Sequence, residues 1–285
     1  MSATIASLTQ ERYGDFQSSV FPFPTTHSDS LPEALEAILA HKSCRAFNRS
    51  KPLLPGTLET LLTAAQSGST SSLFQTWDAI AIQDPENKAK VATLAGNQDF
   101  IRQAPLFLVF CPNLRRLDNL SKQYGKQPAR GLYNMDMFIM STLDAAIAGQ
   151  NVAIAAESLG LGVCFVGALR NNAAQVCELL NLPPLTWGAF GMAIGYVDTE
   201  NELSGKQIKP RLPMREILHM ERWNEDEQKD NVASYDQSLG LFYLGESKLG
   251  RMRWSEFVAS MVASREQDGR ENIRAVIQEQ GFKLE

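Results

Sequence analysis

The chain has 285 residues, of which 44% are apolar and 21% are charged. This is the composition of an ordinary globular protein, and it excludes a disordered or collagen-like chain. The 32 acidic residues outnumber the 27 basic ones and give a net charge of −5. This charge argues against sequence-independent binding to nucleic acid, because such binding needs many cations facing phosphates. Net charge does not fix local charge, so a small basic pocket for an anionic ligand is compatible with it.

Cysteine and histidine are too few and too scattered for a zinc site of the usual spacing. The four cysteines include no C-x-x-C pair, and there are three histidines. We therefore predict no metal site. Cys111 and Cys164 lie in apolar runs, so both are predicted to be buried core thiols.

Two features bear on the cellular location. The first ten residues lack the basic start and apolar block of a secretory signal. The longest apolar stretch, 135–161, contains Asp136, Asp144 and Glu157, and it predicts a buried or interfacial helix rather than a membrane span. We therefore expect no membrane partner and a cytoplasmic location, where thiols stay reduced.

In chain order, residues 1–30 are predicted to form an extended arm with little structure of its own. A helix then begins near Ser30, which can act as its N-cap, and runs to about His41. A second helix follows Pro55-Gly56 and gives way to a polar loop at 67–72. The remaining elements are predicted in this order: a strand at 77–83, a helix at 86–94, a strand at 105–111, a helix at 135–160, a strand at 163–169, a helix at 173–180, a strand at 189–197, and helices at 234–244, 254–264 and 270–280.

Four strands interleaved with helices predict a mixed α+β layered fold. The elements do not alternate regularly enough for a barrel. Gly160-x-Gly162 follows a helix and precedes a strand, which is the reverse of a dinucleotide-binding fingerprint, and the spacing of a phosphate-binding P-loop is absent. The sequence therefore excludes both of these nucleotide-binding motifs.

Two cationic segments, 41–47 and 209–213, lie far apart in the sequence. Each has an ordinary explanation, because basic residues complement the dipole at a helix C-terminus and are well solvated in loops. Between them lie the Ser/Thr-rich run 67–72 and Gln98 in a turn. Hydroxyls, an amide and several cations together could hold a phosphorylated polar ligand, if the fold brings them together.

In this order the segments resemble the nitroreductase family of flavoproteins, and within it the oxygen-insensitive NADPH nitroreductases and NADPH-flavin oxidoreductases. The matching stretches are His41–Phe47 (H-x-S-x-R-x-F), Ser71–Gln75, Thr93–Gln98, Ala155–Gly162, Gly167–Asn172 and Lys209–Pro213. The resemblance implies a nitroreductase-like α+β fold, with an antiparallel-rich sheet flanked by helices, in an intertwined homodimer. It divides the chain into the arm at 1–30, an FMN-binding domain at 31–223, and a C-terminal helical extension at 224–285 that packs on the dimer partner.

The resemblance also implies bound FMN, with NADPH as electron donor and NADH as a possible substitute. The residues that it places at the FMN phosphate are His41, Ser43 and Arg211, with Lys42 standing where the subgroup has an arginine. Arg45 and Lys209 would lie near the flavin ring or its ribityl chain. Arg45 is the expected catalytic residue, because a cation beside N1 and the C2 carbonyl stabilises the negative charge of reduced flavin.

Other matched positions would contact the flavin ring. Thr70 and Ser71 match polar positions near the cofactor, and Gln98 matches a residue that bonds the pyrimidine end. The strand end that would lie along the flavin consists of Phe165, Val166, Gly167 and Ala168, with Ala168 where relatives carry glycine. The segment expected to bind the nicotinamide nucleotide, 245–254, has Gly245 at the main arginine position, so the candidates for this contact are Lys248, Arg251 and Arg253.

The expected function is that of an FMN-dependent NAD(P)H oxidoreductase that reduces nitroaromatic, quinone or similar small-molecule acceptors by a two-electron ping-pong mechanism. One alternative is an NADPH-flavin oxidoreductase whose product is reduced free FMN. A second alternative is a non-enzymatic protein that binds flavin and senses redox state through a partner.

Overall fold

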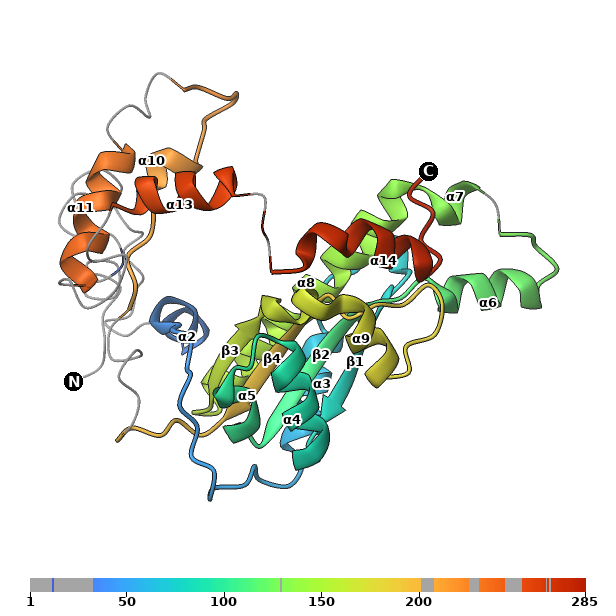
Figure 1. Ribbon diagram of the computed structural model, residues 1–285, viewed down its shortest axis with the longest axis horizontal. Coiled ribbons are helices and arrows are strands. Elements are labelled where there is room, and N and C mark those ends of the chain that lie inside the picture. Colours follow the sequence, from blue (N-terminus) through green and yellow to red (C-terminus); the bar gives the residue numbers. More distant parts are fainter. Residues whose placement is uncertain are drawn as a thin grey trace. The chain divides into compact units, whose positions relative to one another are not determined.

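The computed structural model describes residue 12 and residues 33–128, 130–200, 208–225, 231–243, 253–264, 266 and 268–285. The chain divides into two compact units (Figure 1). The first unit comprises Met1–Lys42 and Gly205–Arg265, and the second comprises Ser43–Ser204 and Glu266–Glu285. The predicted arm at 1–30, apart from Arg12, lies outside the described residues, as do Lys248 and Arg251.

The second unit is built on a four-stranded antiparallel sheet. Its strands are β1 (Trp77–Ile82), β2 (Leu106–Pro112), β3 (Gly162–Val166) and β4 (Phe190–Gly195), in the spatial order β1-β2-β4-β3. All three neighbouring pairs are antiparallel, which confirms the predicted α+β fold with an antiparallel-rich sheet. The structure also confirms the four predicted strands, with ends that differ by up to three residues.

Helices lie on both faces of this sheet (Figure 1). The helices of this unit are α3 (Thr57–Gln66), α4 (Pro85–Leu94), α5 (Asp99–Gln103), α6 (Arg115–Gln123), α7 (Arg130–Tyr133), α8 (Met135–Ser158), α9 (Ala173–Leu179) and α14 (Ile273–Glu279), together with the 3-10 helices η1 (Ser71–Leu73), η2 (Gly167–Asn172) and η3 (Arg270–Asn272). Local sequence explains two of the starts. The side chain of Asp84 accepts a hydrogen bond from the Asn87 amide at the start of α4, and Asn134 caps α8 in the same way.

Strand β2 separates two hydrophobic cores. Every residue of this strand is buried, and successive side chains of a strand point to opposite faces. Phe107, Val109 and Cys111 pack into the core formed with α4, α5 and α9. Leu106, Leu108 and Phe110 pack into the other core, formed with α3 and α8. All four cysteines are buried, which confirms the prediction for Cys111 and Cys164.

Helix α8 is apolar on both of its faces. Among the described residues it is the one helix long and apolar enough to cross a membrane by length and composition. Its inner face packs on α3 and the sheet through a row of small residues, including Ala145, Ala148 and Val152. Its outer face carries an exposed row with a spacing of four residues, formed by Met135, Ile139, Leu143 and Ile147. These contacts support the prediction of a buried or interfacial helix.

The first unit contains α2 (Glu33–Ala40), α10 (Met214–Ile217), α11 (Asn231–Tyr243) and α13 (Trp254–Ala263). Tyr235 of α11 packs edge to face on Trp254 of α13, with ring centroids 5.1 Å apart. Asp236 accepts hydrogen bonds from the amide and hydroxyl of Ser255, at 2.9 and 2.6 Å, in the first turn of α13. A carboxylate stabilises a helix at this end, where amides lack partners within the helix.

The structure corrects one predicted strand end and adds helices that were not predicted, of which α6 is the longest among the described residues. The strand predicted at 163–169 ends at Val166, and the chain continues as the 3-10 helix η2. Leu169 is fully buried within η2, so its apolar character does not mark a strand. Helix α6 was not predicted, because Leu117 and Leu120 are its only large apolar residues and give too short a periodic pattern.

Candidate flavin site

The first unit brings the two cationic segments together through Arg12. The Nη2 atom of Arg12 donates hydrogen bonds to the carbonyl oxygens of Leu39 and His41, at 2.8 and 3.3 Å. The carbonyl of Arg12 accepts a hydrogen bond from the amide of Arg211, at 2.9 Å. Because Arg12 is buried and bonds to both segments, it fixes the end of α2 beside the Arg211 loop.

Further contacts hold the loop that carries Lys209 and Arg211. Ile208 packs on the apolar face of α2, and the hydroxyl of Tyr235 donates to the carbonyl of Pro210 at 3.4 Å. Burial raises the pKa of Tyr235, although the nearby Arg211 opposes this shift, so the hydroxyl stays protonated at neutral pH. The Nη1 atom of Arg211 donates to the carbonyls of Lys209 and Pro210, at 3.2 and 3.1 Å. The guanidinium of Arg211 is exposed above this loop.

In the second unit, the segment that begins at Ser43 runs alongside β3. Ser43 forms a parallel bridge with Val163, and the amide of Cys44 donates to the carbonyl of Val163 at 2.8 Å. This approach requires glycine at position 162, because a Cβ there would lie 2.8 Å from the Cβ of Cys44. Cys44 is buried and Arg45 is exposed. The segment therefore turns the Arg45 side chain outward from a fixed backbone.

Arg45 lines a polar cavity of about 760 Å³. Arg49, Asp198 and Glu200 also line this cavity, so its walls carry charges of both signs. Arg49 forms an ion pair with Asp99 at 2.8 Å, which ties the segment after Arg45 to the start of α5.

The turn that carries Gln98 lies against η2, the 3-10 helix that follows β3. A Cβ added at Gly96 would lie 3.9 Å from the Cβ of Ala168, and the Nδ2 atom of Asn172 donates to the carbonyl of Leu94 at 2.7 Å. The Nε2 atom of Gln98 donates to the carbonyl of Ala95 at 2.8 Å. The turn that carries Gln98 is thus a neighbour of η2, which contains Gly167 and Ala168.

Close to Gly167 lies an arginine that the sequence analysis missed. A Cβ added at Gly167 would lie 3.1 Å from Nη2 of Arg170. Arg170 is partly buried, and its Nη1 atom donates to the carbonyl of Ala189 at 2.8 Å. Burial and the neighbouring Arg270 both lower the pKa of Arg170, burial being the larger cause.

A buried lysine links the two helices on either side of the Gln98 turn. Lys88 of α4 is 6% exposed, and its Nζ atom donates to the carbonyl of Ala104, which ends α5. Gln98 lies between these two helices, so the bond from Lys88 to Ala104 holds both sides of its turn. Burial lowers the pKa of Lys88 below the ordinary value of 10.5, and the carboxylate of Asp84 partly opposes this shift.

This shift gives Lys88 a measurable effect on stability. Between the lowered pKa and 10.5, the unfolded chain binds more protons than the folded chain, so rising pH favours folding. We expect the free energy of unfolding of the wild type to increase relative to that of Lys88→Met between neutral pH and pH 10.5. Urea titrations of both proteins at several pH values measure this difference. A difference that does not change with pH would show that burial does not penalise the charged lysine.

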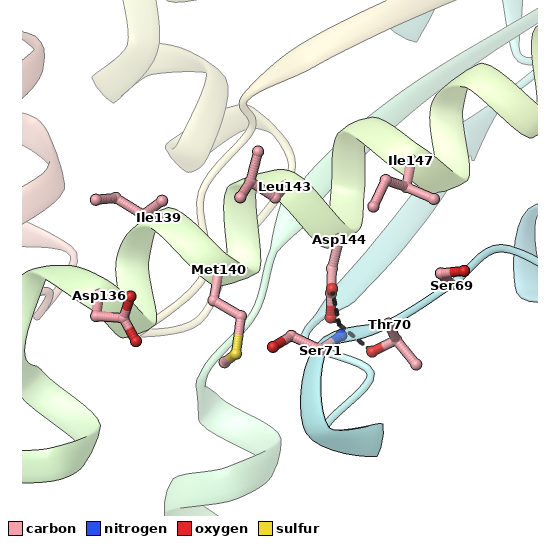
Figure 2. A pocket seen from close by; sticks show the side chains of 9 residues that line it. All are labelled: Ser69, Thr70, Ser71, Asp136, Ile139, Met140, Leu143, Asp144 and Ile147. Atoms are coloured by element: carbon pink, nitrogen blue, oxygen red, sulfur yellow. Dashed lines mark hydrogen bonds between the residues drawn. The ribbon is translucent and has the colours of Figure 1, made fainter. Parts of the chain in front are cut away.

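The polar loop that carries Thr70 and Ser71 contacts α8 instead (Figure 2). The hydroxyl of Thr70 donates to Oδ2 of Asp144 at 2.8 Å, and the amide of Ser71 donates to Oδ1 at 3.1 Å. Ser69, Thr70 and Ser71 line one side of a cavity of about 390 Å³, and α8 lines the other. Asp144 is a second missed residue, although an acid within an apolar helix was a visible signal.

Comparisons with known proteins identify the family of the chain. The model described as "Nitroreductase family" matches residues 38–196, and the model of that family's C-terminal domain matches residues 209–285. The FMN reductase (NADPH) of Bacillus subtilis strain 168 is 36% identical over 255 residues, which cover 88% of this chain and 99% of the relative. The NADPH-flavin oxidoreductase of Vibrio harveyi is 33% identical over 234 residues, which cover 82% of this chain and 92% of the relative.

A solved structure shows the same fold. The NADPH:FMN oxidoreductase from Vibrio harveyi complexed with NAD+ superimposes with a TM-score of 0.77 at 31% identity, and the match covers 89% of this chain and 100% of that one. The family models together span most of the described residues, and the likeness extends over nearly the full length of these relatives. The chain therefore belongs to the nitroreductase family.

Proposed function

We propose that this protein is an FMN-dependent NAD(P)H oxidoreductase that reduces nitroaromatic, quinone or similar acceptors. Its relatives in B. subtilis and V. harveyi are named FMN reductase (NADPH) and NADPH-flavin oxidoreductase. The structural observation that carries the proposal is the pair of bonds by which Arg12 joins His41 to Arg211. These bonds bring together the backbones of two cationic segments that lie far apart in the sequence, which supports a shared anion site.

The residues fit FMN by their chemistry. His41, Lys42, Ser43 and Arg211 are each hydrogen-bond donors of a kind suited to a phosphate dianion, and a guanidinium can donate two parallel hydrogen bonds to it. Gln98 and the strand end Phe165–Ala168 would hold the isoalloxazine ring. A Cβ at Gly167 would lie 3.1 Å from Nη2 of Arg170, so glycine leaves room for this guanidinium beside the backbone.

FMN held by these residues would supply the redox chemistry, namely hydride acceptance from NAD(P)H and two-electron transfer to the acceptor. The chain's own residues would bind FMN and stabilise its reduced form. Arg45 and Lys209 would place positive charge at the pyrimidine edge, where negative charge develops on reduction. The backbone N–H groups after Val166 would donate hydrogen bonds to the isoalloxazine ring. No side-chain acid or base of this chain is assigned a proton transfer.

The protein is proposed to act as a homodimer through the outer face of α8. Met135, Ile139, Leu143 and Ile147 are 40–56% exposed and form a continuous apolar row. Apolar rows of this size are typical of interfaces rather than of solvated surfaces. The molar mass in solution, measured by light scattering, tests this assembly.

A visible absorption spectrum before and after anaerobic addition of NADPH tests the function. We expect flavin bands that bleach on addition. Bands that bleach with NADH but not with NADPH would show that NADH is the electron donor. Bands that persist with both donors would favour the non-enzymatic flavin-binding alternative. A protein that neither contains nor binds flavin would contradict the proposal.

The names of the relatives also favour release of reduced free FMN as a second candidate function. The two candidates differ in the acceptor. Steady-state rates with free FMN and with a nitroaromatic compound, at equal concentrations, separate them, because a flavin reductase has a much higher kcat/KM for free FMN.

A further inference from the structure

We propose that Asp144 is a positioning residue for the cofactor site, which holds the loop from Thr70 to Thr76 so that Ser71, rather than Thr70, offers its hydroxyl to FMN. This inference rests on the proposed function. Its structural half, the holding of the loop, can be measured without flavin.

The carboxylate of Asp144 is saturated by donors from this one loop. Asp144 is 2% exposed and accepts hydrogen bonds from Thr70 Oγ1 at 2.8 Å and from the Ser71 amide at 3.1 Å. It also accepts bonds from the amide and the hydroxyl of Thr76, at 3.1 and 2.9 Å. A carboxylate has about four acceptor positions. Neutral donors therefore compensate this buried charge, and both ends of the loop are tied to one side chain.

Three residues of the loop between these ends have unfavourable backbone conformations. Ser72, Leu73 and Gln75 all have φ values of 50–57°, in the left-handed region that residues other than glycine rarely adopt. Such conformations persist only where the surroundings enforce them. The amide of Gln75 also donates to the hydroxyl of Thr70 at 2.9 Å, and Arg116 of α6 donates to the carbonyl of Gln75. Asp144 is the anchor that contacts both ends.

These bonds give the two hydroxyls different roles. The hydroxyl of Thr70 donates to Asp144 and accepts from Gln75, so its single proton is already used. Ser71 bonds Asp144 through its amide, and its hydroxyl points away from Asp144 along the wall of the cavity (Figure 2). Ser71 is therefore the hydroxyl available to a ligand, and Thr70 is part of the support.

The test compares Asp144→Asn with Asp136→Asn. Asp136 is a matched control, because it lies two turns earlier on α8 and lines the same cavity but is exposed. Asparagine at 144 replaces one acceptor oxygen with an amide that cannot accept. We expect hydrogen exchange at the Ser71 and Thr76 amides to accelerate about tenfold in Asp144→Asn, the effect of losing one charge-assisted bond. Exchange in Asp136→Asn should match the wild type.

The cofactor half of the inference is read from FMN affinity. We expect Asp144→Asn to raise the Kd for FMN about tenfold, while the rate of flavin reduction at saturating FMN stays within about twofold of the wild type. Faster exchange with an unchanged Kd would make Asp144 merely structural and overturn the inference, as would unchanged exchange. A wild type that binds no FMN would instead overturn the proposed function, whatever the variants do.

Three variants of Thr70 and Ser71 keep the inference testable if Asp144→Asn does not fold. Thr70→Val should accelerate exchange at Gln75 and Thr76, and Thr70→Ser, which keeps the hydroxyl, should restore protection. Ser71→Ala should raise the Kd for FMN without changing exchange. The opposite pattern, in which Thr70→Ser weakens FMN binding and Ser71→Ala does not, would contradict the assignment.

Discussion

Replacing Arg45 with alanine is expected to slow reduction of the bound flavin by NADPH about 10²- to 10³-fold, the usual effect of removing a preorganised electrostatic donor. The backbone at this position is fixed on both sides. Ser43 bridges to Val163 of β3, and Phe47 bridges to Val197 after β4. The backbone that carries the Arg45 side chain is therefore held at a defined place in the second unit. Stopped-flow absorbance at saturating FMN measures the rate.

Arg49→Ala is the matched control for Arg45→Ala. Arg49 is an exposed arginine that lines the same cavity and pairs with Asp99 at the surface. A surface pair of this kind contributes little, so the reduction rate should change by less than about twofold. Arg45→Lys should lie between alanine and the wild type, because lysine keeps the charge but not the planar donor geometry. Wild-type reduction rates in Arg45→Ala with FMN fully bound would remove this residue from the catalytic machinery.

Arg211→Ala is expected to weaken FMN binding about 10- to 100-fold, since a hydrogen bond to a charged group contributes roughly 1.5–3 kcal/mol. The fold should survive the change. The bond that ties residue 211 to Arg12 uses the backbone amide, and the side chain itself is exposed. The FMN content after purification and the Kd from fluorescence titration are the two measurements.

Arg215→Ala controls for the general loss of positive charge near this loop. Arg215 is an exposed arginine in α10, four residues further along the chain. It matches no family motif, so its removal should leave FMN content unchanged. Arg211→Lys should retain part of the affinity, because it keeps the charge and loses the bidentate fork. Full FMN occupancy in dialysed Arg211→Ala protein would show that the phosphate is held by other residues.

Periodicity and composition predicted most of the second unit. The leucines of α3 and the unbroken apolar run of β2 are strong signals, and both elements lie where they were predicted. The apolar run at 163–169 predicted a strand that is three residues too long. Leu169 lies in a 3-10 helix and is as fully buried there as it would be in a strand. An apolar residue records that a position is buried, not the backbone conformation that buries it.

Only some of the candidate site residues could be predicted from the sequence. His41, Arg45 and Arg211 could be predicted because they lie in sequence motifs that resemble those of the family. The role of Arg12 could not, because it donates to the backbone carbonyls of Leu39 and His41, and a carbonyl is the same in every residue. Its partners leave no trace in the sequence. Asp144 did leave one, as an acid in an apolar helix, but only the fold shows which donors it collects.

The alternation along β2 has a consequence for how the second unit unfolds. Phe107 and Val109 face one core, while Leu106 and Leu108, their neighbours in the chain, face the other. Neither core can open without withdrawing this strand from both. The Gln98 turn on one side and the Asp144 loop on the other are therefore linked in a single cooperative transition. A destabilising substitution on either side of the sheet should therefore lower the stability of both places.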